Sequence, residues 1–124
     1  MTDWATSQDD VDALKDEYDN LVRFVNEKMW SEKDGFYYDL KADGSFLAVK
    51  TVAAFWALIS KIAPPERVDA LCRHLEDKNE FNRPNRVPAL SADHPDYKDN
   101  GDYWNGGVWA PTDYMILCGL SANG

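Results

Sequence analysis

The chain has 124 residues and a formal net charge of −9, with 22 acidic against 13 basic residues. This length fits a single domain over residues 1–124, with enough chain to bury a core. The acidic balance disfavours nucleic acid and anionic membranes as partners, because both require a basic surface. No apolar run approaches the roughly 18 residues that a membrane-spanning helix needs.

Two further features bear on the cellular location. The first ten residues are polar and acidic and do not resemble a secretory signal. Cys72 and Cys118 lie in apolar helical contexts, at a spacing that suits neither a CxxC pair nor a metal site. A disulfide between them stays open, although a reduced protein fits better. We therefore expect a cytoplasmic protein with no cofactor and no metal.

Apolar residues recur at helical spacing over the first part of the chain. Ser7 is a candidate N-cap, and acidic residues occupy the turn that follows it. These apolar residues predict an amphipathic helix that ends near Trp30 and carries one apolar stripe. The stripe consists of Val11, Leu14, Tyr18, Leu21, Val22, Val25 and Met29. The aromatic segment 34–40 and the turn signal Asp43–Gly44 then predict a short, irregular β-hairpin.

Three more helices are predicted after the hairpin. Residues 51–62 are apolar on almost all sides, which is typical of a helix covered all round. Pro64–Pro65 ends that helix, and Pro65 or Glu66 opens a third one. Residues 80–107 form a long irregular loop with few apolar anchors, and such loops are usually functional or disordered. The last helix runs from about Pro111 to Leu120.

The predicted fold class is therefore all-α, with about four helices, a short β-hairpin and one long irregular loop. Helical hairpins of this kind are the repeat unit of α/α toroids, in which inner and outer helices alternate around a ring. We expect a partial α/α toroid. The striped first helix suits an outer position, and the apolar second helix suits an inner one.

Residues 102–112 concentrate residue types that favour sugar binding. Tyr103, Trp104 and Trp109 surround the pair Gly106–Gly107. Glycine lets the backbone approach a ligand closely, and Trp and Tyr combine an apolar face with a polar edge. A sugar ring suits such a surface. A buried aromatic cluster that caps the last helix is the alternative, and the residue types alone do not decide between the two.

The charged candidates are less specific. Arg83 and Arg86 flank Pro84 at a rigid spacing that suits a bidentate clamp, but they suit loop anchoring better. The local acids are poor candidates for a catalytic pair. They are Asp39, Glu80, Asp93, Asp102 and Asp113. The two nearest to the aromatic motif have structural explanations, since Asp102 suits a turn and Asp113 suits a helix N-terminus. The acidic stretch 93–102 fails the EF-hand pattern, although an irregular oxygen site for a cation stays open.

Three segments together resemble a known family. They are DGFYYD at 34–39, FNRPNRVPAL at 81–90 and YWNGGVWAPTDY at 103–114. In this order they resemble the C-terminal part of the (α/α)6-barrel domain of glycoside hydrolase family 63. That family includes processing α-glucosidases and bacterial relatives active on small α-glucosides and mannosylglycerate, and trehalases share the barrel. The resemblance runs from about Trp30 to Leu120.

The resemblance implies inverting hydrolysis of an α-glycosidic bond, which needs two carboxyl groups roughly 6.5–9.5 Å apart. In the family, the acid is an Asp in a loop before the segment seen here, and the base is a Glu in a loop after it. We therefore expect no catalytic residue in this chain. The carbohydrate-binding residues that we expect are Tyr103, Trp104, Asn105, Gly106, Trp109, Arg83 and Arg86. Asn105 replaces an Arg of many relatives, and Asn85 replaces a His, which weakens the expected affinity.

These observations support three functional hypotheses. The first is a glycoside hydrolase-derived domain that does not catalyse alone and binds carbohydrate weakly. The second is a structural protein that forms homo-oligomers through exposed inner-helix surface. Its expected interface residues are Phe55, Trp56 and Ile59, with Met115 or Leu117. The third is an inverting α-glycosidase that is active only after assembly with a chain supplying the acid and the base.

Overall fold

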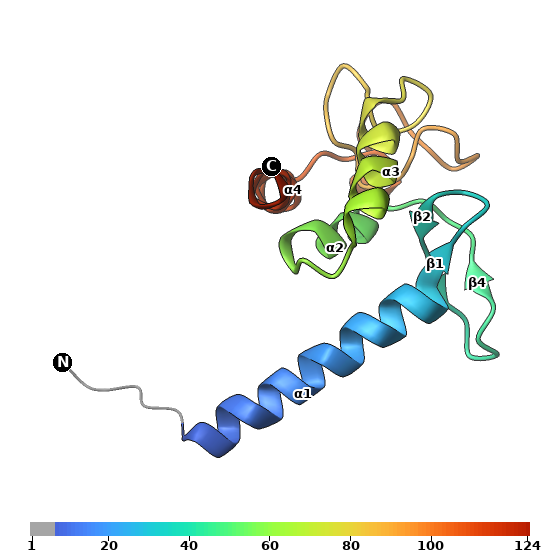
Figure 1. Cartoon of the computed structure of the whole chain (residues 1–124). Helices are drawn as coiled ribbons and strands as arrows, with labels where there is room; N and C mark the ends of the chain where they lie inside the picture. Colours follow the sequence, from blue (N-terminus) through green and yellow to red (C-terminus); the bar gives the residue numbers. More distant parts are fainter. Residues whose placement is uncertain (1–6) are drawn as a thin grey trace.

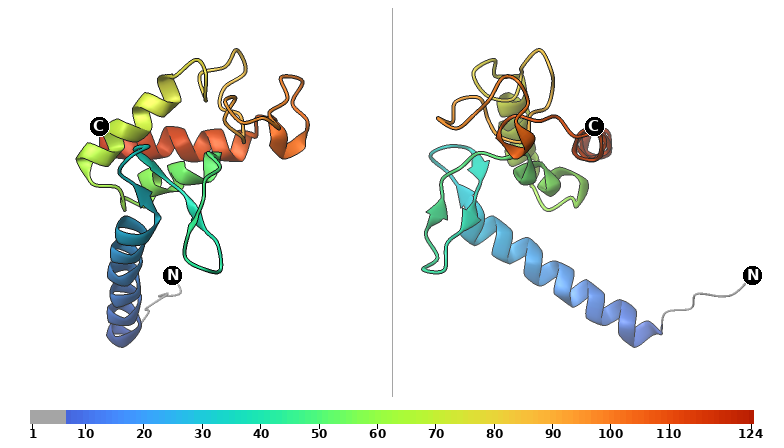
Figure 2. Two further views of the ribbon diagram at one scale, coloured as in Figure 1. Left: turned by 90° about the vertical axis from the view of Figure 1, so that its right-hand side faces the viewer. Right: turned by 180° about the vertical axis from the view of Figure 1, so that it is seen from behind.

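The computed structural model describes residues 7–124, so most of the polar N-terminal segment considered above lies outside the described residues. Four α-helices are joined by two small antiparallel strand pairs and a long irregular loop. Three of the helices form one body with the loop, and the first helix projects away from that body (Figures 1 and 2). The predicted all-α class with about four helices is confirmed.

The first helix, α1, spans Gln8–Phe24 and continues into a π-helical turn, η1, at Val25–Met29. Its start is fixed by a capping box, in which the Ser7 hydroxyl accepts from the Asp10 N–H and the Asp10 carboxylate accepts from the Ser7 N–H. The predicted N-cap and the predicted end near Trp30 are both confirmed. Only the π-helical turn was not expected.

Two strand pairs follow the helix. β1 (Trp30–Ser31) pairs with β2 (Phe36–Tyr37), and β3 (Asp39–Leu40) pairs with β4 (Phe46–Leu47), both antiparallel. The second pair is the predicted hairpin: the Asp43 carboxylate accepts from the Ser45 N–H at 2.9 Å, and Gly44 takes a positive φ. The first pair was not predicted, because strands of two residues leave no periodicity.

The predicted helix over 51–62 is broken into two short pieces. A 3₁₀ turn, η2, spans Val52–Phe55, and α2 covers only Trp56–Ile59. Phe55 is fully buried and forms edge-on contacts with Phe36 and Phe81 at the centre of the core. The expectation that this segment leaves Phe55 in an exposed interface is therefore wrong, and Met115 is buried as well. Trp56, Ile59 and Leu117 are exposed.

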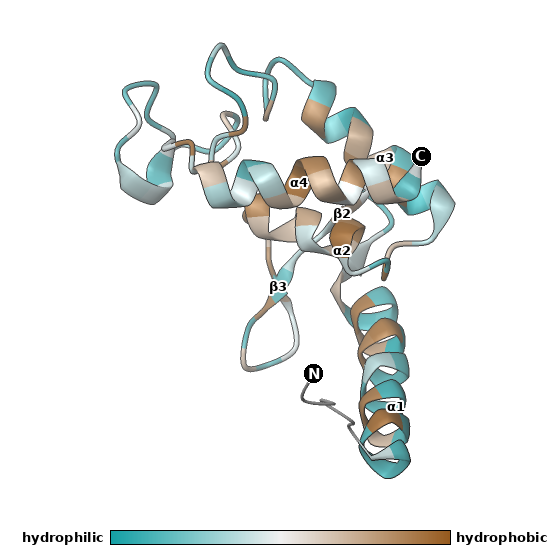
Figure 3. Ribbon diagram, turned by 90° about the vertical axis from the view of Figure 1, so that its left-hand side faces the viewer, coloured by the Kyte–Doolittle hydropathy of each residue, from teal (hydrophilic) through white to brown (hydrophobic). Residues whose placement is uncertain are grey.

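Helix α3 spans Pro65–Glu76, with its first proline at the helix start as predicted, and α4 spans Ala110–Asn123. α4 crosses α2 so closely that a Cβ on Gly119 would lie 2.7 Å from the Leu58 Cβ. Glycine at this position lets the two helices pack in contact along one side of the body (Figure 3). The thiols of Cys72 and Cys118 are both free.

The long loop lies between α3 and α4, over residues 77–109. Its irregular course is confirmed, but the expectation of few apolar anchors is wrong. Phe81 is fully buried, and the segment 88–91 is buried along its whole length. That segment makes isolated antiparallel bridges on both sides, Thr51 with Leu90 and Pro88 with Val108. The loop is thus an integral part of the core.

The apolar side of α1 is largely in the open. Val11, Leu14, Tyr18 and Leu21, here called the α1 stripe, are 41% to 62% exposed. Figure 3 shows apolar bands along α1, away from the rest of the body. Tyr18 makes one link to the body, since its hydroxyl donates to the Ser60 carbonyl at 2.9 Å. Within residues 7–124, no helix combines the length and apolar character needed to cross a bilayer.

Candidate functional site

Three aromatic side chains form a compact group at the start of α4. Tyr103 and Trp104 belong to a 3₁₀ turn, η3 (Tyr103–Asn105), and Trp109 immediately precedes α4. The rings of Trp104 and Trp109 stack with centroids 5.2 Å apart, and Tyr103 contacts both edge-on. Tyr103 is 66% exposed and Trp104 50%, whereas Trp109 is half-buried. We call this group the aromatic stack.

The Gly106–Gly107 pair forms the buried floor beneath the aromatic stack. A Cβ on Gly106 would lie 2.1 Å from the Lys98 carbonyl oxygen, and one on Gly107 would lie 2.3 Å from the Tyr103 carbonyl oxygen. Neither position has room for a side chain, because the obstructing atoms belong to the backbone. The glycines therefore let two backbone segments and an indole ring pack in direct contact.

The two interpretations of the aromatic motif each account for part of it. Trp109 does start the last helix, since its carbonyl accepts from the Thr112 and Asp113 N–H groups at 3.0 and 3.1 Å. Its Nε1 is buried and has no hydrogen-bond partner among the described residues. Tyr103 and Trp104, by contrast, present their rings to solvent. Trp109 thus belongs to the start of α4, whereas Tyr103 and Trp104 form an exposed aromatic surface.

Arg83 serves mainly to anchor the loop. Its guanidinium donates to the Lys78 carbonyl at 2.9 Å and to the Asp99 carboxylate at 3.1 Å, and it lies over the Tyr97 ring. These contacts match the loop-anchoring interpretation. A polar cavity of about 430 Å³ nevertheless lies beside Arg83 and reaches Gly106 below the stack.

Arg86 lies apart from this cavity. It lines a separate, mostly apolar groove with Asp113 and Leu117, between α3 and α4. The structure therefore brings Arg83 and Gly106 together at this cavity, and the three aromatic residues and Asn105 lie close to Gly106 in the chain. Arg86 does not line this cavity, although it borders a separate surface pocket together with Arg83. Asp113 accepts a hydrogen bond from the Val87 N–H at 3.2 Å, and burial raises the pKa of its carboxyl above the ordinary value.

A partly buried polar network joins the two ends of the loop segment 80–93 to Lys50 and His74. Lys50 Nζ contacts the Glu80 carboxylate and lies 2.7 Å from the Asp93 carboxylate, and Glu80 also contacts His74 Nδ1. The other ring nitrogen of His74 lies 2.9 Å from the Asp34 carbonyl, which can only accept, so this nitrogen donates. We call Lys50, His74, Glu80 and Asp93 the polar latch.

Charges within the polar latch stabilise one another. Burial opposes the charged form of Lys50, but hydrogen bonds to Asp93 and Glu80 raise its pKa above the ordinary value. Burial likewise disfavours ionised Asp93, yet Lys50 overcomes this and lowers the pKa of its carboxyl. The sequence offered no signal for this network, because its members are 30 and 43 residues apart. No group of three or more potential metal ligands occurs within the described residues 7–124.

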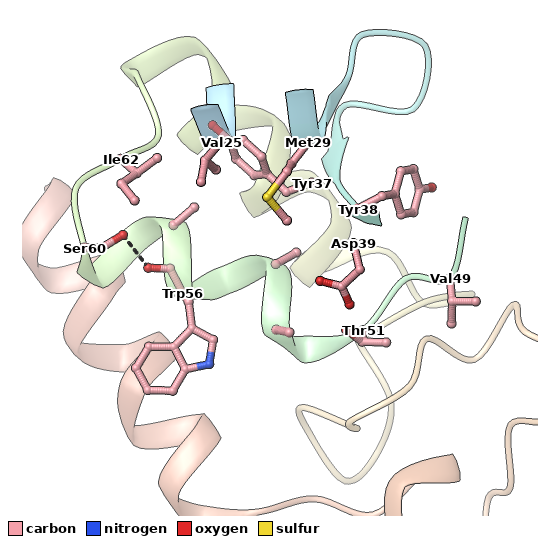
Figure 4. Close-up of a pocket in the computed structure, with 13 residues that line it drawn as sticks. Val25, Met29, Tyr37, Tyr38, Asp39, Val49, Thr51, Trp56, Ser60 and Ile62 are labelled. Carbon is pink, nitrogen blue, oxygen red and sulfur yellow. Dashed lines mark hydrogen bonds between the residues drawn. The ribbon is translucent and has the colours of Figure 1, made fainter. Parts of the chain in front are cut away.

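A second, smaller cavity of about 170 Å³ lies where η1, the strand pairs and α2 meet. Its wall is mostly apolar, with Val25, Met29 and Ile62 among the lining residues. Figure 4 shows the Met29 side chain and the Asp39 carboxylate directed toward the segment that carries Thr51 and Trp56. No pattern in the sequence indicates this cavity, since its lining residues come from separate segments of the chain.

Comparisons with known proteins agree on one family. The family model described as mannosylglycerate hydrolase MGH1-like glycoside hydrolase domain matches residues 2–124. An uncharacterised protein of Borreliella burgdorferi is 35% identical over 96 residues, covering 77% of this chain and 20% of that protein. The mannosylglycerate hydrolase of Thermus thermophilus is 32% identical over 96 residues, covering 76% and 22% respectively. The chain thus spans about a fifth of these relatives' length.

Solved structures give the same result for the fold. The GH63 mannosylglycerate hydrolase of Thermus thermophilus in complex with glucose superimposes with a TM-score of 0.71 at 27% identity, over 79% of this chain and 25% of that one. A neutral trehalase of Saccharomyces cerevisiae, 18% identical, superimposes with a TM-score of 0.71 over 89% of this chain and 20% of its own. The predicted partial α/α toroid and the resemblance to family 63 are both confirmed.

Proposed function

Because this chain belongs to the mannosylglycerate hydrolase MGH1-like glycoside hydrolase domain family, we propose that it contributes a carbohydrate-binding surface to a glycoside hydrolase site. The observation that carries the proposal is the aromatic stack, whose Tyr103 and Trp104 rings are exposed beside a turn of two glycines. The apolar face of a pyranose packs against an indole, while its hydroxyls reach polar edges.

The ligand class that we propose is an α-linked glucoside or mannoside. One relative is a mannosylglycerate hydrolase, and one structural neighbour was solved with glucose. In this chain, Arg83, Asn85 and Asn100 line the cavity that Gly106 also borders. We propose that the hydroxyls of a sugar whose apolar face packs on the stack are directed toward this cavity.

We propose that these residues bind the sugar but do not hydrolyse it alone. Inverting hydrolysis needs two carboxyl groups about 6.5–9.5 Å apart that flank the bond. The acids nearest in sequence to the stack are Asp102 and Asp113, and the Asp113 carboxylate already accepts from the Val87 backbone. The acid and the base would therefore come from residues beyond this chain.

Titration with methyl α-glucoside and methyl α-mannoside, followed by the indole signals of the five tryptophans, tests this function. We expect the Trp104 and Trp109 signals to move with a Kd of about 1 mM, which corresponds to roughly −4 kcal/mol and is within the reach of one or two stacking contacts. Trp104→Ala should abolish the response. Trp56→Ala removes another exposed indole, 55% accessible in α2, and should preserve it. No movement of either signal at 50-fold higher sugar (about 50 mM) would overturn the proposal.

A second candidate function, homo-oligomerisation, is favoured by the α1 stripe together with the exposed Trp56 and Ile59. An apolar helix face left in water forfeits about 1.5–3 kcal/mol for each large side chain, and a two-fold contact between copies would recover part of it. Light scattering on the wild-type protein and on Leu14→Glu decides this. A monomer in both samples at micromolar concentration would contradict it.

A homo-oligomer could also bring a catalytic acid and a catalytic base together in one site. The protein would then be an inverting α-glycosidase only in the oligomeric form. Release of the β-anomer from an α-glucoside, followed by NMR, would then depend on protein concentration. Activity that is independent of concentration would contradict this version of the proposal.

A further inference from the structure

We propose that the polar latch positions the aromatic stack for sugar binding, an inference that rests on the proposed function. None of the latch residues lines the cavity beside Gly106, so we infer that they do not contact a sugar themselves. They act through the segment 88–91, which connects the two sites. The geometry supports this in three steps.

The first step is closure of the loop. Lys50 Nζ contacts Glu80 at one end of the segment 80–93 and lies 2.7 Å from the Asp93 carboxylate at the other. The Ala92 N–H donates to the Glu80 carbonyl at 3.1 Å, which closes the same ends through the backbone. One partly buried ammonium group therefore holds together the two ends of a segment that has no regular secondary structure.

The second step is backbone pairing next to Lys50. The Ser91 N–H donates to the Lys50 carbonyl at 3.0 Å, and the Val52 N–H donates to the Ala89 carbonyl at 2.9 Å. The segment 88–91 therefore runs beside residues 50–52 as a short two-stranded ladder. Its position is set by the same lysine that makes the charged contacts.

The third step reaches the stack. The Ala89 N–H donates to the Gly107 carbonyl at 2.9 Å, and Pro88 bridges to Val108. Gly107 lies directly beneath the aromatic rings, because a Cβ there would be 3.2 Å from Trp109 Nε1. A shift of Ala89 thus moves the floor on which Trp109 rests.

Loss of one latch charge should act locally. Glu80 is buried, and without Lys50 its carboxylate keeps only the contact with the His74 ring. A buried charge that loses a partner is strongly destabilised and draws water or moves outward. The segment that begins at Glu80 would move with it, whereas the His74 ring stays tied to the aromatic core by its edge-on contact with Phe36 and its hydrogen bond to the Asp34 carbonyl.

The experiment uses the whole chain and the variants Lys50→Met and Glu80→Gln. We expect each to shift the indole signals of Trp104 and Trp109 and to weaken binding of methyl α-glucoside about fivefold, while the signals of Trp30 and Trp56 stay in place. Lys50→Arg keeps the charge and should restore the wild-type spectrum. Glu32→Gln, which removes the exposed carboxylate of the ion pair with Arg67, is the matched control and should change neither the Trp104 and Trp109 signals nor the affinity.

Unmoved Trp104 and Trp109 signals in folded Glu80→Gln would overturn the proposal, as would equal shifts at all tryptophans, which indicate general loosening. Should Glu80→Gln not fold, Asp93→Asn provides the same test at a more exposed position of the latch. A wild-type protein that ignores the glucoside would overturn the proposed function instead. The indole shifts would then still decide whether the latch positions the stack.

Discussion

Helix α1 and the loop 77–109 differ in the source of their order. α1 is the longest regular element described, with a capping box at its start, yet every residue of its stripe is at least 41% exposed. The loop has one short 3₁₀ turn and two isolated bridges, yet it buries Phe81 and the whole of 88–91. Local hydrogen bonds hold the helix, whereas tertiary contacts hold the loop.

This difference shows that regular secondary structure and contribution to the core are separate properties in this chain. A helix satisfies its own backbone groups wherever its apolar face lies. A loop must find partners for each buried N–H and C=O, and here the ladder with residues 50–52 and the contact with Gly107 provide them. Five experiments would break or sharpen the contrast.

The largest expected effect comes from truncating one phenylalanine in each region. Phe81→Ala empties a fully buried position packed against Phe36 and Phe55, and it should cost about 3–5 kcal/mol of unfolding free energy in urea. Phe24→Ala, in the half-exposed α1, should cost less than about 1 kcal/mol. Equal costs would mean that another surface covers α1 in solution.

A glycine substitution probes the packing under the aromatic stack. Gly107→Ala would place its Cβ 2.3 Å from the Tyr103 carbonyl oxygen, so we expect a loss of about 1–3 kcal/mol and a displaced Trp109 indole signal. Gly44→Ala is the control, because its surroundings are open and only its positive φ costs roughly 1 kcal/mol. An unchanged Trp109 signal in Gly107→Ala would show that the backbone of the turn can move to accommodate a side chain without displacing the ring.

Removing the capping box tests whether α1 unfolds independently of the rest of the protein. Ser7→Ala should weaken the helix by about 1 kcal/mol, seen as faster amide exchange in the first two turns. Because the start of α1 is exposed, the melting temperature of the body should barely change. Ser121→Ala, at an exposed position of α4, should alter neither quantity. A cooperative drop of the whole melt would show that α1 and the body unfold together.

The smallest effect concerns pH. The carboxyl pKa of Asp93 is lowered in the folded state, so its stabilising contribution is present above the ordinary pKa, near 3.9, and is lost as the pH falls through the lowered value. The Asp93 side chain is 42% exposed, so we expect less than about 1 kcal/mol. Asp93→Asn should therefore reduce the change in unfolding free energy with pH over this acidic range.

The pKa shift of Asp113 is opposite in sign to that of Asp93. Burial raises the pKa of its carboxyl, so ionisation costs stability as the pH rises through the raised value. Asp113→Asn keeps an acceptor for the Val87 N–H and should be neutral or slightly stabilising at pH 7. A clear destabilisation at pH 7 would mean that the ionised form is needed.

The sequence predicted the elements whose signals are local. Ser7 with its acidic turn, the period of α1, the Asp43–Gly44 turn and Pro65 each determine an element within a few residues, and all are confirmed. The run 51–62 was predicted as one helix because a uniformly apolar run has no period to show where it breaks.

Long-range features were beyond such reasoning. A stripe shows which face of α1 is apolar but not what covers it. The polar latch joins residues 30 and 43 positions apart, and no local pattern records that. At the candidate site, the motif resemblance identified the family correctly, and the exposure of Tyr103 and Trp104 agrees with the sugar-binding interpretation. Their role in binding stays a prediction.

The stacked indoles also have an optical consequence. Trp104 and Trp109 lie 5.2 Å apart with their planes inclined by 30°, close enough for their electronic transitions to couple. Excitation is then shared between the two rings, and an exciton couplet overlaps the peptide bands in far-ultraviolet circular dichroism. Helix content taken from those bands would be distorted by two side chains outside any α-helix. The same couplet is a built-in optical signal that disappears when either indole leaves the stack.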